Sequence, residues 1–378
     1  MRIWIEKQRN IIDFTLSSLA RRKGKNTALL VVYTLLVFLL ASVMFFTHAL
    51  RKEASLVLQG APEVVVQRMA AGRHELVPGR YLDAISGIRG VSDVRGRLWG
   101  YYFDPVMSAN YTLMVPADPS PDEGNIAVGH GISRSRFAYA GDLLSFRRYD
   151  GEPMVLTISE VLSPASELVS SDLILISERD FRKLFGMAEG MFTDIVLTVR
   201  NAKEVATVAG KVQKLLPDTR PIMKSEILRT YDTIFDWRSG LIVVILSAAV
   251  LAFVIFAWDK ASGLSAEERK EIGILKAIGW ETSDVLLMKF WEGTTVSLSS
   301  FLSGVVLAYV HVFFTDVVLF EPVLKGWSTL YPTFKLVPYV SAYQVATLFF
   351  LTVVPYTVAT IIPSWRAATI DPDSVMRS

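Results

Sequence analysis

The segment ALLVVYTLLVFLLASVMFFTH, residues 28–48, decides the fold class of this chain. It contains no Asp, Glu, Lys or Arg, and it is as long as the roughly 20 residues that a helix needs to cross the hydrocarbon core of a membrane. Three more apolar blocks of similar length follow at residues 241–258, 296–314 and 342–362. We therefore predict an integral membrane α-helical protein with four transmembrane helices.

The composition fits a membrane protein and excludes several other classes. The chain has 378 residues, of which 51% are hydrophobic and 20% are charged, and its mean hydropathy is +0.37. A net charge of +2 gives no basic excess for nucleic acid, which we exclude as a partner. Because the chain has no cysteine, disulfide bonds, thiol catalysis and Cys-ligated metals are excluded as well.

Basic residues indicate how the helices are oriented, because Lys and Arg near the ends of membrane helices stay on the cytoplasmic side. Seven basic residues precede the first block: Arg2, Lys7, Arg9, Arg21, Arg22, Lys23 and Lys25. Five lie between the second and third blocks: Lys260, Arg269, Lys270, Lys276 and Lys289. Only Lys325 and Lys335 lie between the third and fourth blocks. This alternation predicts that both termini are cytoplasmic and that residues 51–238 lie outside.

The predicted organisation has four parts. Residues 1–27 form a cytoplasmic helix, 28–50 the first membrane helix, 51–238 an extracytoplasmic domain with stalk helices, and 239–378 a three-helix membrane domain. In the first part, Ile5, Ile12, Leu16 and Leu19 recur with helical spacing and form one apolar stripe. Such a helix lies along the inner membrane surface or packs against the bundle, and the pattern fits both equally well.

Residues 51–238 alternate β-type and helical runs, which predicts a mixed α/β domain inserted between the first two membrane helices. The expected strands are 62–67, 97–103, 111–115, 143–147, 155–161, 173–176 and 193–199. The expected helices are 80–88, 178–185 and 202–216, with Ser177 as the N-cap of the second. Helical spacing at both junctions, 50–58 and 227–238, predicts that two membrane helices continue outward as stalks.

The chain lacks the sequence signals of an enzyme or of a self-powered transporter. The pairs Gly24-Lys25 and Gly210-Lys211 are not followed by the Ser or Thr of a phosphate-binding loop, so we expect no ATP site. Gly129 and Gly131 begin a dinucleotide-type spacing, but Arg134 replaces its third glycine. The four histidines give no supported metal site. None of the four apolar blocks contains Asp, Glu, Lys or Arg, so energy for movement is expected to enter through the cytoplasmic loop.

That loop holds the run AEERKEIGILKAIGW, residues 266–280. Acidic residues come first and basic residues follow, an order that suits the helix dipole. Ile272, Leu275 and Ile278 give the predicted helix an apolar edge, and Gly279 is placed to end it. From the pattern alone this is a solvated helix with a small apolar face.

The sequence of this run closely resembles the signature of the MacB/FtsX-type, or mechanotransmission, ABC permeases. In that family an Arg-x-x-Glu-Ile-Gly-Ile-x-x-Ala-x-Gly run follows the second membrane helix and contacts the ATPase. The matching positions here are Glu271, Ile272, Gly273, Ile274, Ala277 and Gly279, with Arg269 one place from the usual base. Three further segments also resemble that family: the C-terminal tail at residues 363–372, the Gly-Asp pair at 141–142 and the largely apolar run at 172–176. The ATPase-coupling residues that the resemblance implies are Glu268, Arg269, Lys270, Glu271, Ile272, Gly273, Leu275, Lys276, Ala277 and Gly279.

The resemblance implies a non-catalytic permease subunit of the bacterial inner membrane. It would work with a separate cytoplasmic ABC ATPase that carries ATP and Mg²⁺, so no cofactor is expected in this chain. The leading hypothesis is export or extraction of a hydrophobic or amphipathic substrate or a lipoprotein. The alternative is a regulatory transducer that activates an extracytoplasmic cell-wall enzyme. A periplasmic adaptor and membrane lipid are further expected partners.

An ATPase dimer needs a two-fold arrangement, so the permease is expected to pair with a second copy or a related subunit. Ser300, Gly304 and Ala308 form a line of small residues along the third apolar block, which permits close helix approach. This line fits either a dimer contact or packing inside one subunit.

Overall fold

The computed structural model describes residues 2–21, 23–163, 170–230, 233, 240, 244, 247–252, 254, 255, 258, 266–321, 330 and 336–368. The chain divides into two compact units. Unit 1 contains 1–51, 235–317 and 336–378, and unit 2 contains 52–234 and 318–335. All the strands of the described residues lie in the second unit.

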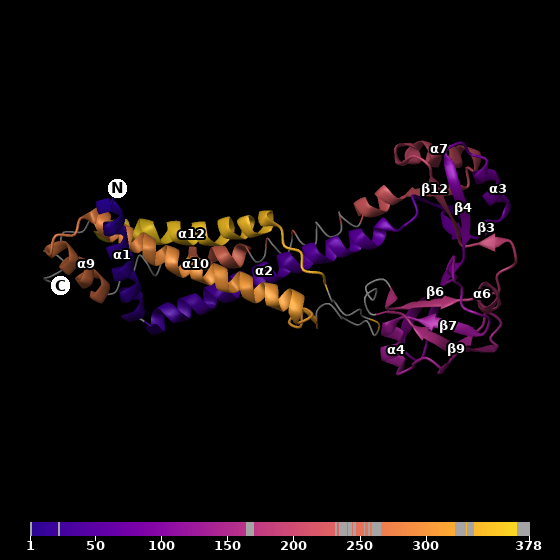
Figure 1. Ribbon diagram of the computed structural model, residues 1–378, viewed down its shortest axis with the longest axis horizontal. Helices are drawn as coiled ribbons and strands as arrows, with labels where there is room; N and C mark the ends of the chain where they lie inside the picture. The colour runs from indigo at the N-terminus through magenta and orange to yellow at the C-terminus, as the bar shows by residue number, and fades with distance from the viewer. Residues whose placement is uncertain are drawn as a thin grey trace. The chain divides into compact units, whose positions relative to one another are not determined.

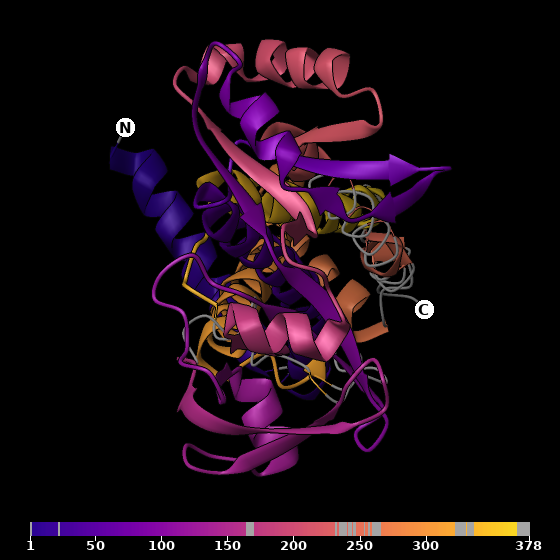
Figure 2. The same cartoon turned by 90° about the vertical axis from the view of Figure 1, so that its right-hand side faces the viewer.

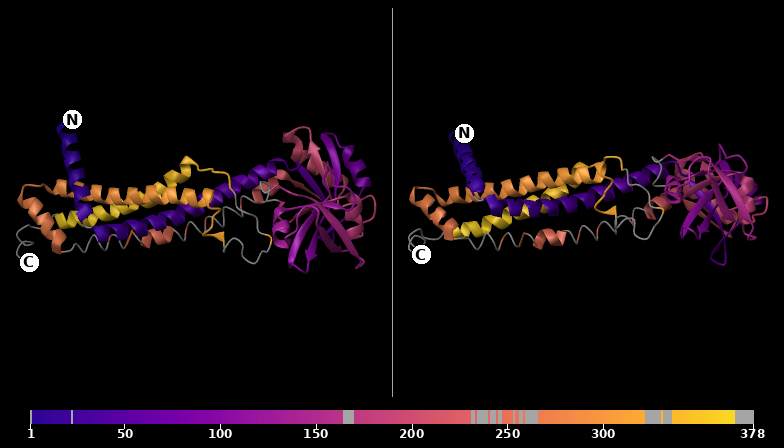
Figure 3. Two further views of the ribbon diagram at one scale, coloured as in Figure 1. Left: turned by 60° about the horizontal axis from the view of Figure 1, so that its bottom comes forward. Right: turned by 90° about the horizontal axis from the view of Figure 1, so that it is seen from below.

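Unit 1 is helical (Figures 1 and 3). Its elements are α1 (Arg2–Arg21), α2 (Lys23–Gln59, which runs on into unit 2), α9 (Ala266–Ala277), α10 (Thr282–Phe314) and α12 (Ala342–Ala368). Among the described residues, three helical segments are long and apolar enough to cross a membrane: Asn26–Glu53, Thr282–Phe314 and Ala342–Ile361. They match the first, third and fourth predicted blocks. Eight of the 18 residues of the second block, and seven of the 12 residues of the second predicted stalk at 227–238, lie outside the described residues.

Close packing joins the three apolar helices, which run side by side in both views of Figure 3. A Cβ atom at Gly304 of α10 would lie 2.7 Å from the Val37 side chain of α2, so only glycine permits this approach. The Tyr33 hydroxyl of α2 donates to the Thr352 carbonyl oxygen of α12 at 2.5 Å, and the two residues are fully buried. Polar contacts of this kind tie helices together where no water competes for hydrogen bonds.

The first sheet of unit 2 has five strands in the order β13-β1-β12-β4, with β2 added to β1. The bounds are β1 Val64–Ala70, β2 Arg73–Glu75, β4 Val91–Arg97, β12 Asp194–Val199 and β13 Thr219–Met223. The helices α3 (Arg80–Ser86) and α7 (Val205–Leu215), the latter preceded by the short 3-10 helix η2 (Ala202–Glu204), cover the sheet. Figure 2 shows α3 and α7 beside the strands of this sheet. The apolar residues Ile85, Val208 and Val212 of these helices share a core with Val64 and Leu197 of the strands.

The second sheet has six strands in the order β5-β6-β10-β7-β9-β8. The bounds are β5 Trp99–Asp104, β6 Ala109–Met114, β7 Asn125–Val128, β8 Leu143–Arg147, β9 Pro153–Val161 and β10 Leu173–Ile176. It packs on α4 (His130–Arg136) and α6 (Glu178–Phe185), and the short strands β3 (Val77–Pro78) and β11 (Met191–Phe192) form a separate ribbon. Ser177 caps α6 as predicted, because its hydroxyl accepts from the Asp180 amide at 3.1 Å.

A buried ionic group fixes the β5–β6 hairpin to the end of α4. The Asp104 side chain is 2% exposed, and its carboxylate accepts from the Tyr111 hydroxyl at 2.6 Å and pairs with Arg136. Burial alone would raise the pKa of Asp104, but hydrogen bonds from Tyr111 and the Val106 amide and the Arg136 charge outweigh it, so the pKa is lowered.

The substitution Asp104→Asn is therefore expected to destabilise unit 2 by about 2 kcal/mol, because it removes hydrogen bonds to a charged group and leaves the half-buried Arg136 guanidinium without its carboxylate partner. A carboxyl whose pKa is lowered by folding stabilises the fold above its unfolded pKa, near 3.8, and this stabilisation is lost as pH falls through the folded pKa. Thermal unfolding of the full chain in detergent between pH 3 and 7 measures both effects. The Asn variant should lose part of the acid dependence; an unchanged pH profile would show that Asp104 contributes nothing to it.

Candidate coupling site

The helix α9 carries the predicted coupling residues and ends as the sequence indicates. Gly279 has a φ of +105°, which disfavours residues with a side chain. The Gly279 amide donates to the Lys276 carbonyl oxygen at 3.1 Å, and the Trp280 amide donates to the Leu275 carbonyl oxygen at 3.0 Å. This pair of bonds is the Schellman motif that closes a helix and turns the chain. The turn leads directly into α10.

One side of α9 is buried against its neighbours. Ile272 is 5% exposed and packs on Val285 of α10, while Leu275 is 6% exposed and packs with Ile11 of α1 and Met288 of α10. The Trp280 ring joins both clusters. The apolar residues Ile272 and Leu275 therefore hold α9 in place, and Gly273 is buried with them.

Ion pairs join α1 to α9 and to the start of α10. Arg21 of α1 lies 3.2 Å from the Glu271 carboxylate, and Lys7 of α1 lies 2.6 Å from the Asp284 carboxylate. Asp284 also takes part in a capping box with Glu281 at the start of α10. The N-terminal helix is thus bound to the coupling segment, although 250 residues separate Arg21 from Glu271 in sequence.

The opposite side of α9 is open. Ile274 is 50% exposed and Ile278 is 70% exposed, and Ala277 and Gly279 are exposed next to them. Residues four apart lie on the same face of a helix, so Ile274 and Ile278 form one apolar patch. Of the predicted apolar edge, Ile272 and Leu275 are buried, whereas Ile278, which directly follows the last residue of α9, is exposed.

The other predicted coupling residues divide into two groups. Glu268, Arg269 and Lys270 belong to α9, but their side chains lie outside the described residues. Lys276 is half-buried at the end of the helix. Sequence reasoning missed the participation of Arg21, Trp280 and Asp284; the acidic residue three places after Glu281 was the one available signal, since it marks a capping box.

The line of small residues on α10 lies inside unit 1. Ser300 and Ala308 are fully buried, and the Ser300 hydroxyl donates to the Leu30 carbonyl oxygen of α2 at 3.3 Å. Gly304 lies against Val37 of the same helix. These residues pack α10 on α2 within this chain.

The helix α1 packs against the bundle, which is one of the two placements that its sequence left open. Ile11 is 4% and Thr15 is 1% exposed, and the Trp291 indole of α10 donates to Gln8 at 3.1 Å, so one side packs on the bundle. Ile5 and Leu16, on the neighbouring side, are 54% and 46% exposed. The helix is therefore packed along one side and keeps an apolar stripe that no described residue covers.

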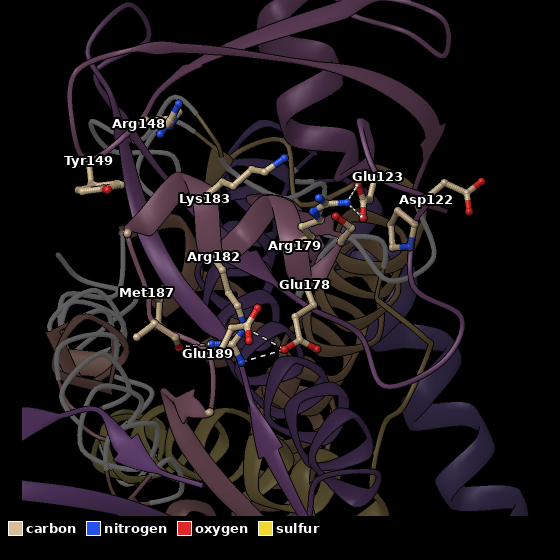
Figure 4. A pocket seen from close by; sticks show the side chains of 15 residues that line it. Asp122, Glu123, Arg148, Tyr149, Glu178, Arg179, Arg182, Lys183, Met187 and Glu189 are labelled. Atoms are coloured by element: carbon tan, nitrogen blue, oxygen red, sulfur yellow. Dashed lines mark hydrogen bonds and ion pairs between the residues drawn. The ribbon is translucent and has the colours of Figure 1, made fainter.

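Unit 2 contains a cavity of about 1250 Å³ that is lined in part by α6 (Figure 4). Ion pairs hold much of its wall, because Arg179 lies 2.9 Å from Glu123 and Arg182 lies 2.8 Å from Glu178. The Tyr149 ring closes one end and rests on Gly186, where a Cβ atom would lie 2.7 Å from the ring. Positive and negative groups line this groove in equal number, and no group of three or more metal-ligating residues occurs in the described part of the chain.

A family model described as the FtsX-like permease C-terminal domain matches residues 239–372. This part of the chain is similar to the C-terminal domain of FtsX-like permeases. The match spans α9, α10 and α12, and thus includes the coupling segment and two of the three apolar helices. The resemblance inferred from the run at residues 266–280 is confirmed at this level, and the protein is a membrane protein.

A curated relative of this chain is an uncharacterized ABC transporter permease of Methanocaldococcus jannaschii. It is 27% identical over 131 residues, and the match covers 33% of this chain and 33% of the relative, so the chain spans about a third of that relative's length.

Among solved structures, this chain matches the crystal structure of the extracellular domain of the noncanonic ABC-type transporter YknZ from Gram-positive bacteria. The identity is 10%, the TM-score is 0.30, and the match covers 42% of this chain and 98% of the other. This TM-score is too low to establish a common fold.

Proposed function

We propose that this chain is the membrane subunit of an ABC complex that couples ATP hydrolysis on a separate cytoplasmic subunit to movement of its α/β domain. The movement serves export or extraction of a hydrophobic or amphipathic substrate or a lipoprotein. The chain itself binds no ATP and catalyses no reaction.

One observation carries the proposal: α9 presents Ile274 and Ile278 to solvent while Ile272 and Leu275 are buried. A solvent-exposed apolar pair on a short helix between membrane segments is costly unless a partner covers it. The FtsX-like domain and the permease relative favour an ABC ATPase as that partner. The other side of the helix is held by the packing of Ile272 and Leu275 and by the Arg21–Glu271 ion pair. A displacement of the exposed patch is therefore transmitted to α1 and α10.

The packing of the apolar helices suits the transmission of a displacement. The fully buried Tyr33 and Gly304 contacts fix α2, α10 and α12 against one another. The helix α2 continues without interruption from Lys23 to Gln59, past the point at Lys52 where unit 2 begins. A continuous helix carries a displacement along its axis, whereas a flexible linker absorbs it.

The test is reconstitution of the full chain with the ATPase subunit that co-purifies with it from native membranes. ATP hydrolysis is expected only when both subunits are present, and changes to the exposed patch of α9 are expected to lower it. Hydrolysis by the purified permease alone would contradict the proposal.

The proposal requires α9 and unit 2 to lie on opposite sides of the membrane. Because the sequence contains no cysteine, single introduced cysteines can test this arrangement. Ser120 in unit 2 and Ser283 at the start of α10 are both exposed, so each of Ser120→Cys and Ser283→Cys introduces one accessible thiol. An impermeant thiol reagent applied to intact cells, with any outer envelope made permeable, is expected to label position 120. Position 283 is expected to react only after the inner membrane is opened. The reverse order of labelling would place α9 outside, where no ATPase could reach it.

A further inference from the structure

A cavity of about 410 Å³ lies between α1 and the α9–α10 turn. Its wall is formed by Glu6, Lys7, Asn10, Ile11, Trp280 and Asp284. We propose that this cavity receives a basic side chain, Arg or Lys, of the cytoplasmic ATPase, and so forms a second contact beside the exposed patch of α9. The inference rests on the proposed function for the identity of the partner.

The cavity already binds one cation of its own chain. The Lys7 ammonium lies 2.6 Å from Asp284, whose side chain is 16% exposed, while the Lys7 side chain remains 50% exposed. The hydrogen bond to Asp284 and the nearby charges of Asp284 and Glu281 raise the pKa of Lys7. The site therefore favours positive charge, and the ammonium that occupies it is accessible enough to be displaced.

The remaining wall suits a guanidinium or an ammonium as well. The lining holds the carboxylates of Glu6 and Asp284 and the ammonium of Lys7, so its formal charge is negative. The Trp280 indole is the aromatic surface that attracts cations most strongly, and the Asn10 amide oxygen can accept a hydrogen bond. The guanidinium of Arg is a flat cation with several hydrogen-bond donors. The carboxylates and the amide oxygen of the cavity can accept those hydrogen bonds, and the indole can stack on the flat cation.

The position of the cavity favours a protein partner over a lipid headgroup. At 3.6 residues per turn, Lys7 and Asn10 are turned by about 160° and about 140° from Ile5 around α1. The cavity thus opens on the side of α1 opposite its exposed apolar stripe. It also adjoins the coupling patch, because Trp280 follows Ile278 by two residues and closes the same turn. A partner that covers Ile278 reaches the cavity.

The first experiment uses the full chain in nanodiscs and Nα-acetyl-L-arginine amide as the probe, with the neutral Nα-acetyl-L-citrulline amide as its control. Saturable binding of the arginine amide alone is expected. The Lys7→Met variant removes the competing ammonium, so its affinity for the probe should rise about fivefold, the scale of one accessible ion pair. Asn10→Lys places a second ammonium in the cavity and should abolish the binding, whereas the matched Asn10→Gln should preserve it. A purely structural role for Lys7 predicts the opposite, a loss of binding in Lys7→Met.

The second experiment measures how much of the co-purifying ATPase each variant retains. Asn10→Lys should lower retention about tenfold because like charges meet in the interface, and Asn10→Gln should not.

If Ile278→Asp releases the ATPase while Asn10→Lys keeps it, the cavity proposal is wrong and the proposed function stands. If neither variant affects the ATPase, the proposed function itself fails. If the arginine amide binds in phosphatidylglycerol nanodiscs but is excluded in phosphatidylethanolamine nanodiscs, a lipid ammonium occupies the cavity and the proposal is overturned.

Discussion

The substitution Ile278→Asp is expected to reduce ATPase stimulation by the permease about tenfold or more. Ile278 is 70% exposed and lies at the end of α9, beside the exposed Ile274. An aspartate there would be buried without a charge partner once the ATPase covers the patch, and this costs more than the roughly 1.4 kcal/mol that corresponds to a factor of ten. The isolated permease should keep its stability, because the side chain contributes little to its core.

The measurement is ATP hydrolysis by the reconstituted complex as a function of permease concentration, together with thermal unfolding of each variant. Leu215→Asp is a matched control, since Leu215 is a similarly exposed aliphatic residue, 51%, at the end of α7 in unit 2. It should leave stimulation unchanged. Normal stimulation by Ile278→Asp would mean that the exposed patch of α9 is not the coupling surface.

The coupling segment shows where sequence reasoning succeeds and where it stops. Gly279 and the acidic-to-basic order were sufficient to predict a helix that ends at that glycine, because these signals are local. Which apolar face is buried depends on α1, and the Arg21–Glu271 pair joins residues far apart in sequence. The spacing of Ile272, Ile274, Leu275 and Ile278 fits more than one face, so the local pattern could not identify the exposed pair.

The same limit applies to the strands of unit 2. β8, β10 and α6 were predicted with their observed bounds, because their apolar spacing and flanking residues are clear. β4 was missed: its sequence VSDVRGR is largely polar, yet it pairs with β12 at the edge of its sheet. β13 was missed because it contains Pro221, which an edge strand tolerates. The helix α4 contains glycine and two serines and is stabilised by packing more than by helix propensity.

The spacing of Gly129 and Gly131 has a structural role in this fold and does not indicate dinucleotide binding. Their separation begins a dinucleotide-type motif, but the two glycines lie at the start of α4 against the backbone of Ser170 and Ser171. The Gly129 amide donates to the Leu173 carbonyl oxygen at 2.7 Å, and the Ile132 amide donates to the Ser171 carbonyl oxygen at 3.2 Å. The glycines therefore allow α4 to approach the segment that leads into β10.

The substitution Gly129→Ala is accordingly expected to cost unit 2 about 3 kcal/mol or more. The added Cβ atom would lie 1.8 Å from the Ser170 carbonyl oxygen and 2.7 Å from the Ser171 carbonyl oxygen. Both are backbone atoms, so no side-chain rotation relieves the overlap. Either α4 or the strand β10 must move, and the core that joins Ile132 to Ile174 opens with it. Hydrogen exchange of the full chain should show lost protection in β7 and β10, with little change in α10 and α12.

Gly210→Ala provides the matched control, because Gly210 lies within α7 and a Cβ atom added there would meet no atom of a neighbouring element within 4 Å. Alanine is the better helix former by about 1 kcal/mol, so this variant should match or exceed the wild-type protection. The two substitutions add the same methyl group to the same unit, and they differ in whether backbone already occupies the space. Equal protection in both variants would mean that the approach of α4 to Ser170 and Ser171 does not constrain the fold.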